Sequence, residues 1–168
     1  MTKIIVCEKP DAMDHIAMAL AESDLKRMRS RYGVNYYEFL RDGERHIAVS
    51  SVGHLFGLKQ IERGADYPIF DAEWVPSFEN VKKASFSSKY FNTIKDIAKS
   101  NREYDLVSAC DFDNEGSLIA ERIIRLIFRK SDAKRMKFST LTKSDLIDAY
   151  DNMMPHLDWG NIIAGETR

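Results

Sequence analysis

Two short, largely apolar runs constrain the fold most, because each has the length and composition of a strand buried on both faces. The first covers residues 3–7, "KIIVC", and the second covers residues 104–110, "YDLVSAC". A pattern of apolar residues at helical spacing follows each run. Buried strands that alternate with helices are typical of α/β domains with a mainly parallel sheet. We therefore predict an α/β fold in which helices flank a mainly parallel central sheet.

The remaining pattern predicts the other elements. Helices are expected over residues 12–23, 87–101 and 115–128 and from Thr142 onward. The Asp42-Gly43 pair between two apolar runs is a strong β-hairpin signal, and residues 134–140 indicate a late strand. Residues 53–58 and 65–78 mix glycine, proline and aromatic residues without a period, so we expect ordered loops there. The predicted order is β-α-β-β-loop-α-β-α-β-α.

Composition bounds the class of protein. The chain has 168 residues, of which 44% are hydrophobic and 30% are charged, so a packed domain of ordinary size is expected. A net charge of −1 gives no global sign of a nucleic-acid surface. No stretch approaches the ~18 apolar residues of a membrane helix. Cys7 and Cys110 are each the last apolar residue of a predicted strand. This placement suits reduced thiols in an intracellular protein and not a disulfide framework. We predict a cytoplasmic location and no membrane partner.

The chain divides into two predicted parts of unequal length. Residues 1–152 carry the alternating pattern and form the predicted main domain. Residues 153–168 include "WGNIIAGETR", an apparent helix without a stop signal. We interpret residues 153–168 as the truncated start of a following helical domain.

An acidic turn follows the second apolar run. Asp111, Asp113 and Glu115 lie within five residues, and Gly116 comes next. In open α/β sheets, ligands bind beyond the carboxyl ends of the strands, where Asp111 is expected. Carboxylates this close repel each other, and Mg²⁺ relieves the repulsion because it prefers carboxylate, water and phosphate oxygens. A purely structural alternative has Asp113 capping the helix and Glu115 complementing its dipole, which leaves Asp111 unexplained.

Two other acidic motifs share part of this spacing. An EF-hand loop resembles Asp111-x-Asp113-x-Glu115-Gly116. Its position 12 would be Arg122, where a bidentate glutamate is needed, and a strand precedes the loop. A D-x-D phosphatase motif usually follows an early strand and has Thr or Val where this chain has Glu115. Neither motif accounts for the turn.

A second acid ends the first apolar run. Glu8 and Lys9 follow Cys7 directly, and Asp111 follows Cys110 in the same way. If the two strands are parallel neighbours, their acids face one crevice, and the two cysteines lie side by side beneath it. Four carboxylates beside a lysine describe a phosphodiester site. In such a site one acid donates a proton to a leaving oxygen, others hold Mg²⁺ and the lysine steadies the phosphate.

Taken in order, these motifs resemble a known family. "EKP" after an N-terminal strand and "DFDNEG" after a later strand look like the Toprim domain shared by topoisomerases, primases and some nucleases. "SVGHLFGL", "YPIFDAEWVP" and "RMKFSTLTKSDL" resemble segments that follow in type IA DNA topoisomerases of the archaeal and bacterial type. The resemblance covers essentially the whole chain. It implies a Rossmann-like Toprim fold with a β-hairpin insertion. It also implies an enzyme that relaxes DNA by transient single-strand cleavage and rejoining through a 5′-phosphotyrosine.

The resemblance also implies roles for individual residues. Glu8 matches an acid implicated in proton transfer at the scissile phosphate, and Lys9 matches a phosphate-stabilising lysine. Asp111, Asp113 and Glu115 match the triad that binds Mg²⁺. On this basis Glu8, Lys9 and Asp111 are the candidate catalytic residues, and Glu8 joins the triad as a candidate metal ligand.

Contacts to DNA are expected from residues around this site. His54 in "GHL" and Arg168 are the candidates, and closing a loop is the alternative role for His54. Asn114 stands where the family commonly has arginine, which removes a cation beside the triad. The basic stretch of residues 26–31 and the ring of Trp74 are further candidates for phosphate contact and base stacking. A solvated face and loop packing are their structural alternatives.

The function classes differ in what they require beyond this chain. Seven tyrosines are present, and none has the sequence context of the family's nucleophile, so the chain is expected to be an inactive fragment. The expected cofactor is Mg²⁺. The expected partners are a single-stranded DNA segment and the remaining domains of the same enzyme, in the cytoplasm and associated with the nucleoid through DNA. The alternatives are a stand-alone Mg²⁺-dependent Toprim nuclease and a non-catalytic interaction module.

Overall fold

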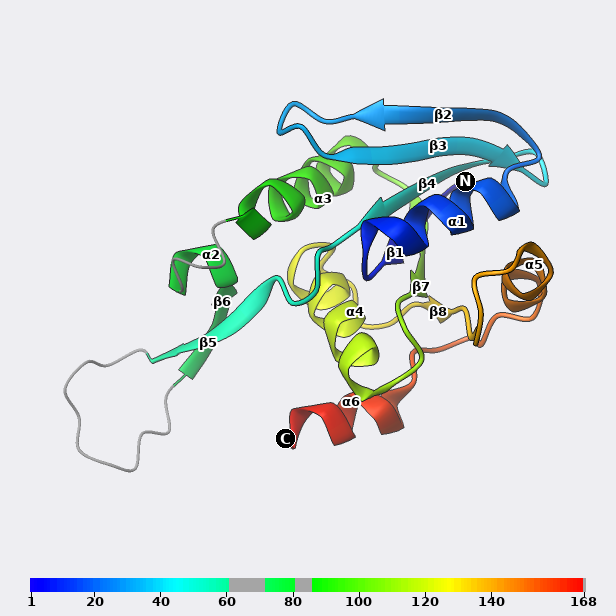
Figure 1. The fold of residues 1–168 in the computed structure, drawn as a ribbon. Coiled ribbons are helices and arrows are strands. Elements are labelled where there is room, and N and C mark those ends of the chain that lie inside the picture. Colours follow the sequence, from blue (N-terminus) through cyan, green and yellow to red (C-terminus); the bar gives the residue numbers. More distant parts are fainter. Residues whose placement is uncertain (61–71, 81–85, 168) are drawn as a thin grey trace.

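The computed structural model describes residues 1–60, 72–80 and 86–167, and its elements confirm the α/β prediction (Figure 1). The strands are β1 (Thr2–Cys7), β2 (Ser23–Arg29), β3 (Asn35–Arg41), β4 (Glu44–Ser50), β5 (Phe56–Gln60), β6 (Ala72–Pro76), β7 (Tyr104–Ala109) and β8 (Lys134–Arg135). The helices are α1 (Pro10–Leu20), α2 (Ser77–Asn80), α3 (Ser88–Ser100), α4 (Asn114–Leu126), α5 (Lys143–Asp151) and α6 (Trp159–Glu166).

A six-stranded sheet in the order β2-β3-β4-β1-β7-β8 forms the centre of the fold. β1 runs parallel to β4 and to β7, and β7 runs parallel to β8. β2, β3 and β4 pair in antiparallel fashion, and β5 and β6 form a separate two-stranded sheet that projects to the left in Figure 1. The central strands are therefore parallel, as predicted, and the carboxyl ends of β4, β1 and β7 meet at one edge.

Apolar side chains pack on both faces of this sheet. On one face, Ile94 of α3 and Ile123 of α4 pack in the same cluster as Val6 of β1. On the other face, Ile16 of α1 and Leu146 of α5 are clustered with the remaining inward residues of the strands. Successive strand residues point to opposite faces, so a strand covered on both sides has no polar face. Within the described ranges, no helix has the length and apolar composition needed to cross a membrane.

The register between β1 and β7 corrects the expectation that the two cysteines lie side by side. Cys7 pairs with Ala109, so Cys110 lies one residue further along its chain. Side chains alternate along a strand, and the offset therefore puts Cys7 in the α1–α5 layer and Cys110 in the α3–α4 layer. Both thiols are free, and burial raises the pKa of each, that of Cys110 to about 12. The two cysteines serve as core side chains.

The predicted hairpin forms between β3 and β4. Asp42 and Gly43 have φ angles of 53° and 72° at its turn. Positive φ at both central residues suits the right-handed twist of the flanking strands. This hairpin lies between the edge strand and the parallel centre of the sheet.

Several expected loops contain strands instead. Most of the basic stretch forms the edge strand β2, in which all but one residue is exposed, so its solvated face is carried by a strand and not by a loop. An edge strand without a buried face carries no apolar alternation, and its charges protect the open edge. Residues 53–58, expected as a loop, contain the start of β5, and residues 65–78, also expected as a loop, contain β6. These two strands pair with each other across residues 61–71, and no period in either segment reveals that pairing.

The strand expected over residues 134–140 is much shorter than predicted. Only Lys134–Arg135 pairs with β7, and the backbone N–H of Met136 donates a last bond to the carbonyl oxygen of Ser108. The apolar and basic residues beyond it leave the sheet and line its carboxyl edge.

The last helix packs closely against α4. Ile162 of α6 joins the core on the α3–α4 face. A Cβ atom on Gly165 would lie 2.8 Å from the carbonyl oxygen of Asn114, so glycine permits the close approach. The Nη2 atom of Arg122 on α4 also donates to the Oε1 atom of Glu166 over 2.7 Å. Residues 159–166 are thus part of the packed body in this structure.

Candidate active site

The carboxyl ends of β1 and β7 bring Glu8 and Asp111 together. The backbone N–H of Asp111 donates to the Oε2 atom of Glu8 over 3.2 Å. The Glu8 side chain is only 9% exposed. Its carbonyl oxygen accepts hydrogen bonds from the Ser51 hydroxyl over 2.9 Å and the Gly53 N–H over 3.2 Å. The loop after β4 therefore holds the residue from one side and the turn after β7 holds it from the other.

Burial raises the pKa of the Glu8 carboxyl above its ordinary value, and repulsion from the Asp111 carboxylate raises it further. The N–H of Asp111 and the charge of Lys9 act in the opposite direction. The Lys9 Nζ atom lies 3.8 Å from Glu8 Oε1, and its side chain is 62% exposed. Glu8 therefore holds a proton more readily than a free glutamate, with an exposed cation beside it.

Asp113 begins α4 as its N-cap. Its Oδ1 atom accepts a hydrogen bond from the Gly116 N–H over 2.6 Å, and its own N–H donates to the Asp111 carbonyl oxygen over 2.9 Å. The structural alternative for this residue, a helix cap, is thus confirmed. The cap uses one carboxylate oxygen.

Gly116 allows the turn to fold back on the first turn of α4. A Cβ atom here would lie 2.3 Å from the carbonyl oxygen of Asp111 and 2.9 Å from its nitrogen. Any other side chain would displace the backbone of Asp111. The glycine therefore fixes where the acidic turn, defined here as Asp111–Glu115, lies relative to the helix.

The side chains of Glu115 and His54 are in contact across the same edge. The Nε2 atom of His54 lies 3.2 Å from the Oε1 atom of Glu115, and the two side chains are 41% and 69% exposed. His54 comes from the loop between β4 and β5, so three separate segments of the chain meet at the acidic turn. Both the metal-ligand prediction for Glu115 and the loop-closing alternative for His54 are compatible with this contact.

Arg135 is a residue of this site that sequence reasoning missed. Its side chain is buried beneath the turn, where Nη1 donates to the Cys110 carbonyl oxygen and Nη2 donates to that of Asp111 over 2.7 Å. Its guanidinium also lies 5.2 Å from the ring centroid of Phe112. Burial lowers the pKa of this guanidinium. The sequence signal for Arg135 was its position inside a strand-like run. A cation in such a run is ordinarily solvated when the strand is at the edge of a sheet, so the signal did not indicate a buried role.

The structure brings some of the predicted residues together and leaves others apart. Glu8, Lys9 and Asp111 meet at one edge, whereas Asp113 caps a helix and Glu115 contacts His54. In the part of the chain that the structure describes, no three His, Cys, Asp or Glu side chains already form a metal-holding group. The metal centre remains a prediction. Arg168, the other DNA-binding candidate, lies outside the described residues.

A cavity of about 380 Å³ opens beside the acidic turn. Asp111 and Phe112 line one side, and Lys137 and Thr140 line the other. The Lys137 Nζ atom lies 4.6 Å from the ring centroid of Phe112. The carboxyl edge therefore offers a concave space with an acid and a cation on its walls.

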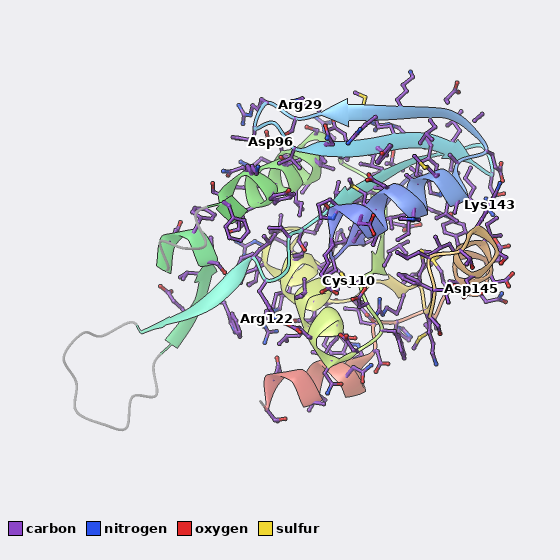
Figure 2. All side chains as sticks on the ribbon, in the orientation of Figure 1. Arg29, Asp96, Cys110, Arg122, Lys143 and Asp145 are labelled. Atoms are coloured by element: carbon purple, nitrogen blue, oxygen red, sulfur yellow. The ribbon has the colours of Figure 1, made fainter. Side chains whose placement is uncertain are left out.

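The other candidate DNA contacts are partly engaged by the protein itself. The guanidinium carbon of the buried Arg122, which is labelled in Figure 2, lies 4.3 Å from the centroid of the Trp74 ring. This contact confirms the packing alternative for Trp74. In the basic stretch, Arg31 pairs with Asp96 of α3 over 2.9 Å. Lys26, Arg27 and Arg29 on β2 remain exposed.

The fold and these contacts define an α/β domain whose acids gather where two parallel strands end. A family model described as the Toprim domain matches residues 3–141. The chain belongs to the Toprim domain family, as its motifs predicted.

Its relatives are several times longer than this chain. It is 41% identical to a protein named DNA topoisomerase 1 from Pyrococcus furiosus, covering 98% of this chain and 16% of that protein. It is 39% identical to DNA topoisomerase 1 from Methanocaldococcus jannaschii, covering 100% of this chain and 21% of that protein. The match to the structure of full-length topoisomerase I from Thermotoga maritima covers 99% of this chain and 23% of the Thermotoga chain, with a TM-score of 0.57 and 22% sequence identity. This last likeness concerns the fold.

Proposed function

We propose that this chain is the Toprim part of a type IA DNA topoisomerase, which relaxes DNA by transient single-strand cleavage and rejoining through a 5′-phosphotyrosine. The names of its relatives and the match to the Toprim family support the proposal. The observation that carries it is the meeting of Glu8 and Asp111 at the carboxyl ends of two parallel strands. This edge is where α/β domains bind their ligands.

In this proposal Glu8 handles the proton at the scissile phosphate. Its raised pKa allows the carboxyl to give a proton to the leaving 3′ oxygen and to take it back on rejoining. Lys9 is exposed beside it and can hold a phosphate oxygen by charge. Asp111 keeps Glu8 oriented through its N–H and adds negative charge at the same edge.

Mg²⁺ fits the donors at this edge. Carboxylate oxygens are the ligands that this hard cation prefers, and the repulsion between Glu8 and Asp111 is the kind a divalent cation relieves. Asp111, Asp113 and Glu115 would hold the ion, with Glu8 as a further ligand. When bound, Mg²⁺ neutralises charge on the phosphodiester.

The tyrosine nucleophile is proposed to lie in another part of a longer enzyme. Among the described tyrosines, Tyr104 begins β7 at the opposite edge of the sheet. The hydroxyl of Tyr150 is hydrogen-bonded to the Nε2 atom of His46 over 2.6 Å. We infer that residues 1–152 form the Toprim domain and that residues 153–168 begin the next, helical domain. The proposed partners are single-stranded DNA and those further domains, in the cytoplasm and associated with the nucleoid through DNA. The chain alone should be inactive.

Calorimetric titration with Mg²⁺ tests the metal site. Asp111→Asn with Asp113→Asn removes two carboxylates while Asn still caps α4. We expect Mg²⁺ affinity to fall by at least about tenfold and the stability of the metal-free chain to hold or rise, because repulsion with Glu8 is relieved. The control, Glu103→Gln with Asp148→Asn, removes two exposed acids elsewhere and should titrate like the parent. Unchanged Mg²⁺ binding in the first variant would eliminate the metal site and favour an interaction module.

Incubation with supercoiled plasmid separates the topoisomerase from the stand-alone nuclease. The topoisomerase proposal predicts no relaxation or nicking by the chain alone with Mg²⁺. Mg²⁺-dependent nicking that Asp111→Asn abolishes would favour the nuclease. Sequencing the natural gene beyond the codon for Arg168 gives an independent check. A long continuation with a tyrosine-bearing domain is expected, and an immediate stop codon would contradict the proposal.

A further inference from the structure

A cluster of unpaired cations lies at the edge of the sheet opposite the acidic turn. We call it the distal basic patch, and its members are Lys95, Lys99, Arg129, Lys130 and Lys134. They surround Tyr104, the first residue of β7, whereas the acidic turn follows the last. Within the described ranges, none of the five has an acid within ion-pair distance. The patch and the acidic turn therefore carry opposite charge at opposite ends of β7.

An aromatic hollow of about 370 Å³ lies within the patch, between α3 and the end of α4. Phe91, Tyr104 and Phe128 contribute rings to its lining, and Lys95 and Lys99 stand on one wall. Tyr104 and Phe91 are half-buried, so part of each ring is open to solvent, while Phe128 is buried. No acidic residue is among the described residues that line the hollow. Cations and open rings are thus combined without a compensating acid.

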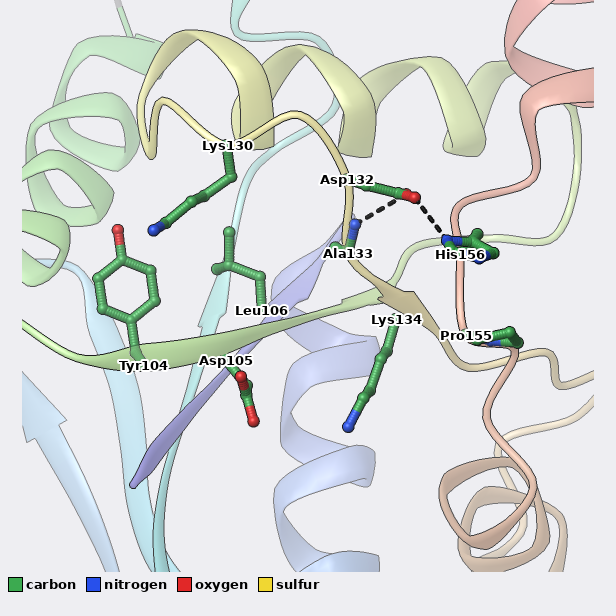
Figure 3. Close-up of a pocket in the computed structure, with 9 residues that line it drawn as sticks. All are labelled: Tyr104, Asp105, Leu106, Lys130, Asp132, Ala133, Lys134, Pro155 and His156. Carbon is green, nitrogen blue, oxygen red and sulfur yellow. Dashed lines mark hydrogen bonds and ion pairs between the residues drawn. The ribbon is translucent and has the colours of Figure 1, made fainter.

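A second cavity of about 380 Å³ continues the patch and shares Tyr104 with the hollow. In Figure 3 the side chains of Lys130 and Tyr104 point toward one another, and the Nζ atom lies 5.6 Å from the ring centroid. Asp132, which also lines this cavity, accepts hydrogen bonds from His156 over 2.7 Å and from the Ala133 N–H over 2.9 Å. The charge of Asp132 is therefore already engaged. Asp105 also lines this cavity and lies beyond ion-pair distance of Lys130 and Lys134, so it lowers the net positive charge of the patch without pairing with either lysine.

Helix dipoles explain only part of this arrangement. Lys99 lies in the last turn of α3 and Arg129 follows the end of α4, where cations are favoured by the partial negative charge of the helix terminus. That preference does not require open aromatic rings between the cations. An isolated lysine is usually solvated, but five cations around three rings make a surface suited to a flexible polyanion with flat apolar groups.

We propose that the distal basic patch binds single-stranded nucleic acid, with phosphates at its lysine and arginine side chains and a base against Tyr104. Cationic grooves combined with aromatic faces are the common means of binding single strands without sequence preference. An acidic peptide shares the negative charge but lacks the flat rings that Tyr104 and Phe91 accommodate. The proposed site lies at the opposite end of β7 from the acids, so binding there does not depend on a metal ion.

Fluorescence anisotropy with a labelled oligothymidylate, in EDTA, tests the proposal on the 168-residue chain. Lys95→Gln with Lys99→Gln removes two phosphate contacts. Their loss should lower the salt slope by about 1.4, which corresponds to roughly 60-fold weaker binding at about 50 mM monovalent salt. The matched control, Lys89→Gln with Lys143→Gln, removes two exposed lysines outside the patch and should bind like the parent. Circular dichroism verifies that both variants fold.

Tyr104→Leu tests the ring separately. It keeps apolar volume against Phe128 and should weaken binding at least about fivefold without changing the salt slope. The proposal is overturned if the parent chain does not bind the oligonucleotide, or if the patch and control variants lose affinity equally. It is also overturned if polyglutamate of equal length displaces the probe as well as unlabelled oligothymidylate does, since the patch would then be a general site for acidic peptides.

Discussion

Replacing Gly116 with alanine should destabilise the chain through the acidic turn. The new Cβ would lie 2.3 Å from the Asp111 carbonyl oxygen, so that backbone must move by at least about 0.7 Å to reach the 3.0 Å that real Cβ contacts respect. Forcing such a shift in packed structure costs about 1–3 kcal/mol. The higher helix propensity of alanine offsets up to about 1 kcal/mol of this. We expect a net loss of roughly 1–2 kcal/mol in the free energy of unfolding.

Gly160 provides a matched control in α6. A Cβ atom there meets its nearest neighbour, the Oδ1 atom of Asp158, at 3.5 Å, which is an ordinary contact. Gly160→Ala should therefore stabilise the chain by about 0.5 kcal/mol or more. Urea denaturation followed by circular dichroism measures the free energy of unfolding of both variants. If their m-values are equal, the difference between their urea midpoints reports the difference in stability. If Gly116→Ala were as stable as Gly160→Ala, the close approach of the acidic turn to α4 would be wrong.

Three further predictions concern buried charge, acid stability and helix capping. Arg122→Leu removes the buried guanidinium beside the Glu121 carboxylate and leaves that carboxylate with only the half-exposed Arg125, so it should cost about 2 kcal/mol or more in the same urea assay. Arg125→Leu leaves the buried Arg122 in place and should cost under about 1 kcal/mol. Burial lowers the pKa of His46 below its ordinary value of 6.5, so the unfolded chain binds the proton more readily. The stability that the neutral His46 ring contributes is complete at pH values above 6.5, and it is lost as pH falls from 6.5 through the lower pKa of the folded chain. A thermal unfolding series should show a flatter acid dependence for His46→Gln, and an unchanged slope would contradict the assignment. Asp113→Ala removes the cap of α4 and should cost about 1 kcal/mol, while Asp113→Asn should cost far less; equal losses would show that the cap does not contribute.

Sequence patterns predict the parts of this fold that bury apolar residues on a regular period. β1 and β7 are recognisable because both of their faces are covered, and α3 and α4 because one face of each packs on the sheet. β2 is not recognisable, because an edge strand exposed on both faces has no apolar period. β5 and β6 form a separate two-stranded sheet and are stabilised by pairing with each other, and such pairing leaves no period in either segment.

The candidate site divides in the same way. Glu8 and Asp111 could be placed at one edge because parallel neighbouring strands end together. Arg135 could not, since its partners are backbone carbonyl oxygens that exist as a group only after the turn has folded. The contact between His54 and Glu115 likewise depends on the path of the loop after β4.

The contacts at the acidic turn differ in how readily they can be exchanged. Arg135 is buried and bonded to two carbonyl oxygens, and Glu8 is 9% exposed, so these groups are fixed by the fold. Glu115 and Lys9 are 69% and 62% exposed, and exposed ion pairs contribute only about 0–1 kcal/mol each. A cation or a phosphate that arrives at this edge therefore competes with weak contacts at Glu115 and Lys9 and leaves the buried support beneath Asp111 unchanged. The site combines a rigid base with outer side chains that are free to change partners, which is the combination that a metal and a DNA phosphate would require.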